Sequence, residues 1–207
     1  LLSRRQRQMC IRDRFDADKH VQKITDFFRC LKDGGRYVSC DYGTQNATVF
    51  LLWNKGNNGK WYCVREYYYS GRAKGKQKTD GEYADDFEKW LDGVPIRAVI
   101  VDPAAASFIA ELRKRGYRVL KADNDVEDGI REVASMLNMG LLVFCDTCIN
   151  TIMEFGSYIW DEKAAQQGED RPVKENDHAM DAVRYFVYTI LSKRTGRVKN
   201  KAKYGFD

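Results

Sequence analysis

The apolar pattern of this chain changes character partway along, and that change constrains the fold more than any other feature. Three apolar segments rich in aromatic and β-branched residues come first, separated by short turns: Arg36–Tyr42, Thr48–Trp53 and Trp61–Tyr69. The turn between the last two, Lys55–Lys60, is rich in glycine and asparagine, as hairpin connections are. We therefore expect an antiparallel meander at the start of the domain.

After the meander, predicted strands and helices alternate. The expected strands are Arg97–Val101, Tyr117–Lys121 and Leu141–Cys145, and the expected helices are Tyr83–Leu91, Ala104–Arg115, Val126–Asn138, Thr147–Phe155 and Asp177–Leu191. Such alternation implies parallel strands joined by helical crossovers. The order predicts an α/β fold in which a mixed sheet, first antiparallel and then parallel, is flanked by helices. This is a ribonuclease H-like architecture.

We divide the chain into four expected parts. Residues 1–14 contain the stretch Gln8–Asp13, which resembles translated adaptor sequence from library preparation, so we expect a non-native leader there, with a native basic arm as the alternative. Residues 15–35 are expected to form a linker helix, since apolar residues recur at helical spacing over Asp16–Lys32. Residues 36–192 form the predicted ribonuclease H-like domain, and residues 193–207 a basic tail.

Charge and cysteine content narrow the setting. The net charge is +5, and residues 1–14 supply five arginines and one aspartate, so the remainder carries 30 basic and 29 acidic residues, a net of +1. Nucleic-acid binding would then depend on local basic patches.

No apolar run approaches the ~20 residues that span a bilayer, so we expect no membrane partner. Outside residues 1–14 there are five cysteines, and this odd number without framework spacing fits a reducing cytoplasm. The lone pair Cys145 and Cys148 fits a strand end and helix start better than zinc binding.

Two aspartates stand at the ends of predicted buried strands. Asp41 ends the run Tyr37–Cys40, and Asp102 ends the run Ala98–Val101. Functional sites of open α/β sheets lie at the carboxyl edge of the strands. An aspartate there can also begin a turn or cap a helix, so neither residue decides alone. Two aspartates at equivalent strand ends favour a site.

A third acidic group lies at the start of the last predicted helix. Asp177 and Asp181 are four residues apart and His178 and Asp181 three apart, so all three project from nearly one helical face. Asn176 is expected to cap the helix, and a first-turn position would explain Asp177 through the helix dipole. Asp181 lies a full turn in, among core-facing residues, where a carboxylate needs a partner such as a cation.

These carboxylates suggest a metal site. Oxygen ligands suit magnesium or manganese, and two such ions about 4 Å apart can hold a phosphodiester from both sides. The expected ligands of the two Mg²⁺ or Mn²⁺ ions are Asp41, Asp102, Asp177 and Asp181. No nucleophile signature surrounds either histidine, His20 or His178. The pattern therefore favours metal-dependent hydrolysis of phosphodiesters.

Three segments resemble a known family. Ser39–Thr48 (SCDYGTQNAT), Val101–Phe108 (VDPAAASF) and Asp177–Tyr185 (DHAMDAVRY) are similar to the C-terminal nuclease domain of phage and prophage large terminases, of the type found in phages of Gram-positive bacteria. The resemblance runs from about Arg36 to Ser192. No single motif is specific, but the three in this order are.

The resemblance implies more than the residues show. It implies a ribonuclease H/integrase-like fold, two metal ions, an acidic triad of Asp41, Asp102 and Asp181, and His178 near the metals. It implies an endonuclease that cuts concatemeric double-stranded viral DNA during packaging. The small subunit and the portal would be its partners, in the cytoplasm of an infected or lysogenic bacterial host. Ser157–Lys174 would be a hairpin beside the site.

The chain departs from full-length large terminases in one respect. Those proteins carry an N-terminal ATPase, and no GxxxxGK[ST] motif is found here; Gly71–Lys78 (GRAKGKQK) lacks the required spacing. We therefore expect the chain to cleave DNA but not to translocate it alone.

Basic residues in two segments are candidates for phosphate contacts. They are Arg72, Lys74, Lys76 and Lys78 in a predicted loop after the third strand, and Lys193 and Arg194 at the start of the tail. Such residues could bind the DNA backbone without reading its sequence, and ordinary solvated surface charge is the alternative.

The sequence is compatible with two other functions. A junction resolvase or another ribonuclease H-like nuclease would share the carboxylates and differ in substrate. A non-catalytic module that docks on the packaging machinery would bind no metal.

Overall fold

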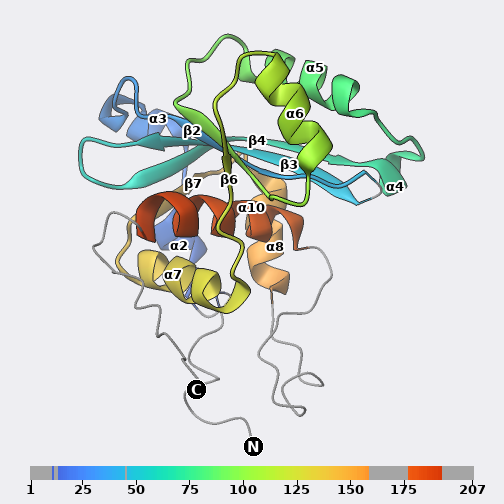
Figure 1. The fold of residues 1–207 in the computed structure, drawn as a ribbon. Coiled ribbons are helices and arrows are strands. Elements are labelled where there is room, and N and C mark those ends of the chain that lie inside the picture. Colours follow the sequence, from blue (N-terminus) through green and yellow to red (C-terminus); the bar gives the residue numbers. More distant parts are fainter. Residues whose placement is uncertain (1–10, 12–13, 45, 159–176, 193–207) are drawn as a thin grey trace, which may run out of the picture.

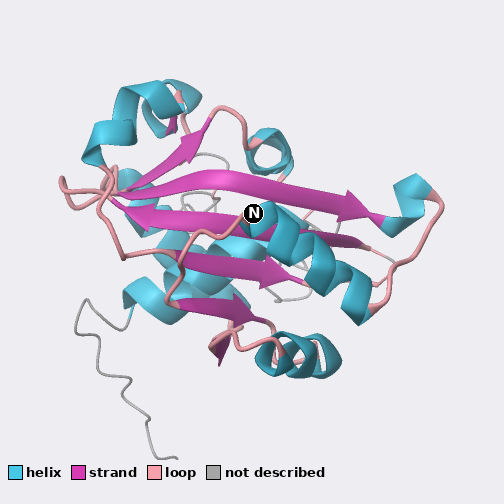
Figure 2. Ribbon diagram, turned by 90° about the horizontal axis from the view of Figure 1, so that it is seen from above, coloured by secondary structure: helices cyan, strands magenta, loops and turns pink. Residues whose placement is uncertain are grey.

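A seven-stranded mixed sheet forms the centre of the molecule. The computed structural model describes residues 11, 14–44, 46–158 and 177–192. The strand order is β1-β7-β4-β3-β2-β5-β6. The strands are β1 (Val21–Gln22), β2 (Tyr37–Asp41), β3 (Ala47–Lys55), β4 (Trp61–Ser70), β5 (Ala98–Val101), β6 (Val119–Lys121) and β7 (Leu142–Cys145). Viewed from above, they lie side by side in one continuous sheet (Figure 2).

The pairing pattern confirms the predicted mixed sheet. β2, β3 and β4 form the antiparallel meander, while β5 pairs with β2 in parallel, β6 with β5, and β7 with β4. The helices are α2 (Ala17–His20), α3 (Ile24–Phe27), α4 (Gly71–Lys74), α5 (Asp80–Leu91), α6 (Ala106–Lys114), α7 (Val126–Asn138), α8 (Ile149–Ser157) and α10 (His178–Phe186). The turn η1 (Phe28–Cys30) follows α3, and α10 continues into a wider π-helical turn, η2 (Val187–Leu191).

Helices cover both faces of the sheet and create two apolar cores. In Figure 1, α5 and α6 lie on one face, and α7, α8 and α10 on the other. Alternate residues of β3 divide between the cores because side chains of a strand point to opposite faces. Val49 and Leu51 belong to the α10 side, and Phe50 and Leu52 to the α5 side.

This alternation also decides where the strand-end aspartates point. Tyr37 of β2 belongs to the core on the α10 side, and Asp41 lies four residues further along the same strand. Ile100 of β5 belongs to the same core, and Asp102 follows two residues later. Both carboxylates are therefore placed on the face that α10 covers. α10 is fastened there partly by Phe186, whose ring stacks on Trp53 with centroids 4.3 Å apart.

The prediction of one helix over Asp16–Lys32 is wrong. The segment is divided into α2, β1, α3 and η1, because Val21 and Gln22 pair in parallel with the edge of β7. Pairing with a distant strand has overridden the helical apolar spacing, as tertiary contacts commonly do. The segment packs onto the domain through Phe27, which is buried and stacks on Tyr62.

Several element boundaries also differ from prediction. α5 begins at Asp80 rather than Tyr83, since Thr79 and Glu82 form a reciprocal capping box. Gly71–Lys74, predicted as loop, is one helical turn capped by Ser70. α7 is capped by Asp125, whose side chain accepts a hydrogen bond from the Asp128 N–H.

Parts of several predictions lie outside the described residues. These are residues 193–207, most of Ser157–Lys174 and most of residues 1–14. Ile11, within the predicted leader, is described and is buried in the core on the α10 side. Within the described residues, the structure contains no helix of the length and apolarity needed to cross a bilayer.

Candidate functional site

The end of β2 and the start of α10 together form the acidic side of the site. Asp177 immediately precedes α10 rather than lying in its first turn, and the predicted cap Asn176 lies outside the described residues. His178 begins the helix, and its Nδ1 lies 2.9 Å from Oδ2 of Asp41. The predicted convergence of Asp41 with this helix is therefore observed.

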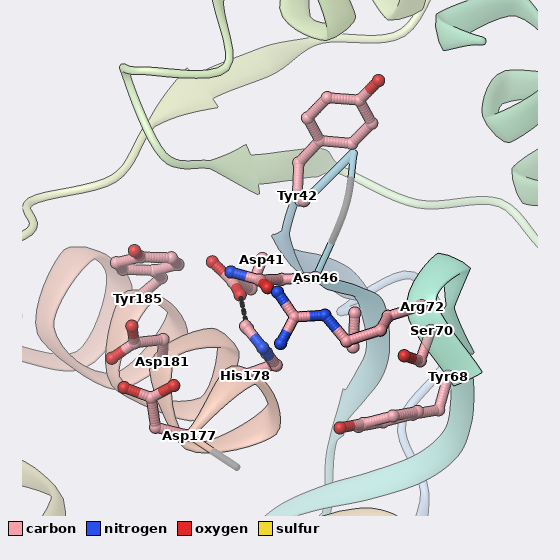
Figure 3. A pocket seen from close by; sticks show the side chains of 12 residues that line it. Asp41, Tyr42, Asn46, Tyr68, Ser70, Arg72, Asp177, His178, Asp181 and Tyr185 are labelled. Atoms are coloured by element: carbon pink, nitrogen blue, oxygen red, sulfur yellow. Dashed lines mark hydrogen bonds and ion pairs between the residues drawn. The ribbon is translucent and has the colours of Figure 1, made fainter. Parts of the chain in front are cut away.

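A polar cavity of about 550 Å³ opens beside this contact. Asp41, Asp177, His178 and Asp181 line one side (Figure 3). The opposite side is formed by the β2–β3 turn, the end of β4 and the short helix α4, which contribute the side chains of Asn46, Tyr68, Ser70 and Arg72. The cavity thus has an acidic wall facing a wall rich in hydrogen-bond donors.

Burial and like charges set the ionisation of Asp41. Burial raises the pKa of Asp41 to about 6; the hydrogen bond from His178 opposes this rise, and the nearby Asp181 and Asp177 add to it. The pKa of His178 is also raised, chiefly by its hydrogen bond to Asp41. An ionised Asp41 is therefore costly here unless positive charge compensates for it.

Asp181 is held by an arginine of its own helix. Both Nε and Nη2 of Arg184 contact Oδ1 of Asp181, at 3.2 and 2.8 Å. Asp181 still lines the cavity, so its carboxylate is shared between the arginine and the open space. The sequence-based expectation that this carboxylate needs a partner is met by Arg184.

Asp102 does not line the cavity directly. Its Oδ1 accepts the Ala104 N–H at 2.7 Å, which matches the turn-forming role considered from sequence. Its Oδ2 accepts the hydroxyl of Tyr185 at 2.7 Å, and Tyr185 does line the cavity. Asp102 is thus joined to the site through a tyrosine.

The side chains near the cavity are of the type that binds hard divalent cations, but they do not converge on one point. Within the described residues, no group of three or more His, Cys, Asp or Glu side chains converges closely enough to hold a metal ion. The donors near the cavity are nevertheless carboxylates, and Asp41, whose side chain is 15% exposed, lies near two further acidic residues. Carboxylate oxygens and uncompensated negative charge are what Mg²⁺ and Mn²⁺ bind.

Sequence reasoning missed three buried polar residues around the site: Glu154, Arg184 and Tyr185. Glu154 of α8 accepts the backbone N–H groups of Ala179 and Met180 at 2.7 and 3.2 Å, and burial raises its pKa to about 7. The sequence could have indicated two of them, because Glu154 and Arg184 interrupt apolar helical runs, and a charged side chain in such a run requires a partner.

The four basic residues after β4 have different surroundings. Lys78 pairs with Asp86 and lies over the ring of Tyr69, 4.1 Å from its centroid, so it has a structural role. Lys76 pairs loosely with Glu82 at 3.8 Å, and Lys74 is exposed. Only Arg72 of the four lines the cavity beside Asp41, and it also lines a neighbouring hollow of about 480 Å³. Lys193 and Arg194 lie outside the described residues.

The cysteine pair behaves as the structural interpretation expected. Cys145 ends β7, Cys148 immediately precedes α8, and both are buried. The Sγ atom of Cys148 lies 3.8 Å from that of Cys63.

The space beside Arg184 depends on a glycine of α7. A Cβ at Gly129 would lie 2.6 Å from Cγ and 2.8 Å from Cδ of Arg184. Gly129→Ala should therefore lower the free energy of unfolding by about 1–3 kcal/mol through overpacking, although alanine is ordinarily the better helix former. Chemical denaturation would measure it. Gly81→Ala in α5 is the matched control, since its Cβ would meet nothing closer than 3.9 Å. Equal stabilisation by both substitutions would contradict the packing argument.

The fold and the cavity together define a ribonuclease H-like protein with a carboxylate-lined site at the carboxyl edge of its central strands. Comparison with known families identifies the particular one. The model of the family described as "Terminase RNaseH-like domain" matches residues 39–189. The chain therefore belongs to this family and corresponds to the nuclease domain of a terminase large subunit.

Individual relatives agree with this assignment. The large terminase of a thermophilic bacteriophage, solved in complex with ADP, is 52% identical, with a TM-score of 0.81, over 88% of this chain and 45% of its own. The large subunit of the terminase of Escherichia phage T5 is 26% identical over 188 residues, 86% of this chain and 41% of its own length. The chain thus spans less than half of these relatives. The large terminase nuclease domain of bacteriophage SPP1, solved with bound Mn, shares the fold with a TM-score of 0.57 and 19% identity, over 83% and 96% of the two chains.

Proposed function

We propose that this chain is a metal-dependent endonuclease that cleaves concatemeric double-stranded viral DNA during genome packaging. The observation that carries the proposal is the cavity in which three aspartates and a histidine face Asn46, Ser70 and Arg72. Binding and cleavage of a phosphodiester would use both walls of the cavity. Donors on one wall can hold its anionic oxygens, and carboxylates on the other can hold the cations that neutralise it.

Two Mg²⁺ or Mn²⁺ ions are the cofactors that fit this donor set. Asp41, Asp177 and Asp181, which line the cavity, would hold them together with Asp102, which the hydroxyl of Tyr185 joins to the site. When bound, such ions supply an activated water and stabilise charge on the leaving oxygen. The burial of Asp41 among other carboxylates supports this assignment, because a buried anion beside like charges favours a bound cation. The manganese in the SPP1 nuclease domain supports a divalent ion as well.

The side chains of this chain have separable roles in the proposed reaction. Arg72 holds a phosphate against the acidic wall, since its guanidinium is directed into the cavity (Figure 3). His178 offers its Nδ1 to Asp41, which leaves Nε2 to exchange a proton with water or the leaving oxygen. Lys74 and Lys76, with Lys193 and Arg194 of the tail, add backbone contacts farther along the duplex.

The proposed setting follows the family. The enzyme would act with the terminase small subunit and the portal, in the cytoplasm of an infected or lysogenic bacterial host. The 52% identity to the large terminase of the thermophilic bacteriophage, over 88% of this chain, supports placement in a packaging complex.

Cleavage of supercoiled plasmid in the presence of Mn²⁺ tests the proposal directly. The native chain should nick and linearise the plasmid, and EDTA or the substitution Asp102→Ala should abolish both. A native chain that neither cleaves nor binds Mn²⁺ would contradict the proposal and favour a non-catalytic docking module. A strong preference for four-way junctions over linear duplex would instead favour a junction resolvase.

Arg72 should affect DNA binding more than chemistry. Among the residues that the structure describes, it has no ion-pair partner, in contrast to Lys76 and Lys78. Arg72→Ala should raise KM for DNA roughly 10-fold, since a hydrogen-bonded charge contact contributes about 1.5–3 kcal/mol. The slope of log KM against log salt should fall by about one.

The matched control for this measurement is Arg118→Ala. Arg118 is also exposed and immediately precedes the edge strand β6, at the end of the parallel strands away from Asp41. Its removal changes the net charge by the same amount. Equal effects of the two substitutions would show that Arg72 acts only through overall charge.

A further inference from the structure

Two adjacent residues on one turn of α10 contact two separate carboxylates of the candidate site. Arg184 contacts Asp181, and Tyr185 donates its hydroxyl to Asp102. Asp181 lies on the same helix and Asp102 follows the distant strand β5. One helical turn therefore orients carboxylates that come from unconnected parts of the fold.

The side chain of Arg184 is buried and held by several hydrogen bonds. Its side chain is 4% exposed, and its Nη1 donates to the backbone carbonyls of Asn124 and Asp125 at 2.9 and 3.2 Å. Gly129 leaves room for its aliphatic part, as the close approach of a Cβ there shows. Each end of the guanidinium is thus engaged, and its planar fork presents fixed donors to Asp181.

The geometry of the Arg184 contact leaves part of Asp181 available. Both guanidinium contacts fall on Oδ1, while the residue lines the cavity. Oδ2 is therefore the oxygen that the arginine does not take. An arginine that served only to neutralise Asp181 would gain more from engaging both oxygens in a bidentate pair.

Tyr185 performs the corresponding task for Asp102. Its ring borders the cavity, its hydroxyl lies 2.7 Å from Oδ2 of Asp102, and Cζ of Arg184 lies 4.8 Å from the ring centroid. Because the Ala104 N–H takes the other oxygen, the Asp102 carboxylate is held at both ends. The guanidinium over the ring in turn restrains the tyrosine.

We propose that Arg184 and Tyr185 are the positioning residues of the site, holding Asp181 and Asp102 in the orientation that divalent-cation binding requires. This inference rests on the proposed nuclease function. Hydrogen-bond partners that orient metal-binding side chains typically contribute about 10–100-fold in metal affinity or activity. A purely structural role would instead change stability and leave the affinity for the cation unaltered.

The test compares conservative variants with matched controls. Tyr185→Phe removes one hydroxyl and keeps the ring, and Arg184→Lys keeps the charge but loses the fork. Tyr188→Phe is the control on the same helical segment, where the hydroxyl reaches Asp128 at 3.4 Å. Arg131→Lys is the control for an arginine that pairs with carboxylates three and four residues away on its own helix, at the surface.

Three quantities would be measured: the Kd for MnCl₂ by isothermal titration calorimetry in the absence of DNA, kcat and KM on linear duplex, and Tm. We expect Tyr185→Phe and Arg184→Lys to weaken Mn²⁺ binding and lower kcat about 10–100-fold, with KM for DNA within about twofold. Both controls should match the native chain.

The outcomes separate this inference from the function on which it rests. A native chain that binds no Mn²⁺ and cleaves nothing overturns the proposed function, and this inference with it. A native chain that binds and cleaves, together with a Tyr185→Phe variant of native Kd and kcat, overturns the inference alone. If Arg184→Lys fails to fold, Tyr185→Phe decides.

Discussion

Asp41→Asn should abolish DNA cleavage and, at the same time, stabilise the metal-free protein. The activity loss is expected because Asp41 is the carboxylate at the meeting point of β2 and α10, in contact with His178 and lining the cavity. Removing one such charge should lower kcat by roughly 10³-fold or more, since groups that stabilise charge in a reaction contribute on that scale.

The gain in stability follows from the burial of the same carboxylate. Burial raises the pKa of Asp41 from 3.8 to about 6, so the folded state disfavours the ionised form. At about 1.4 kcal/mol per tenfold change in acidity, the cost of ionising it in the folded protein is about 3 kcal/mol. That cost is absent below pH 4, grows as the pH rises from about 4 to 6, and is complete at neutral pH. Asparagine does not ionise and avoids it.

Denaturation in EDTA at pH 4 and at pH 7.5 would measure this effect. The variant should exceed the native chain in unfolding free energy at pH 7.5 and approach it at pH 4. Asp33→Asn is the control, because this exposed aspartate precedes β2 at its other end and should change neither cleavage nor stability. Full activity of Asp41→Asn would remove Asp41 from the site, and equal stabilities at both pH values would contradict the burial argument.

Glu154→Ala should lower the free energy of unfolding by about 2–3 kcal/mol and reduce cleavage with it. Glu154 accepts two backbone N–H groups at the start of α10, where Asp177 makes no side-chain cap of its own. It also accepts the hydroxyl of Tyr68 at 3.0 Å. Loss of a cap costs about 0.5–2 kcal/mol, and buried donors left unsatisfied cost more. Activity should fall because α10 carries the residues that line the acidic wall.

Glu154→Gln provides the comparison. Burial raises the pKa of Glu154 to about 7, so the folded state disfavours its ionised form, and a neutral amide oxygen can accept the same backbone donors. We expect Glu154→Gln to stay within about 1 kcal/mol of the native chain in urea denaturation and to keep most of the activity. Equal losses in both variants would show that the charge of Glu154, rather than its capping geometry, is required.

The sequence was sufficient for features that depend on local order. The strand ends at Asp41 and Asp102 and the helical spacing of His178 and Asp181 are short-range patterns, and the structure has each of them. Strand alternation even places both strand-end carboxylates on one face. The order of antiparallel and parallel strands could be read for the same reason, because connection length restricts how consecutive strands pair.

The remaining features depend on contacts that no local pattern encodes. β1 exists because Val21 meets Phe144, a residue more than a hundred positions away, and the apolar spacing of that segment indicates a helix instead. Lys78 looks like its basic neighbours in sequence, yet Asp86 and the ring of Tyr69 remove it from the set available to DNA.

What the sequence by itself determined is therefore the framework: which residues carry charge, at which strand ends and on which helical face. What only the tertiary structure decided is how those charges are held. Tyr185 holds Asp102 through its hydroxyl, Arg184 contacts one oxygen of Asp181, and Glu154 caps α10 from a neighbouring helix. A buried polar group needs a partner, and the sequence can indicate that need. The identity of the partner depends on which distant segments the packed core brings within hydrogen-bonding distance.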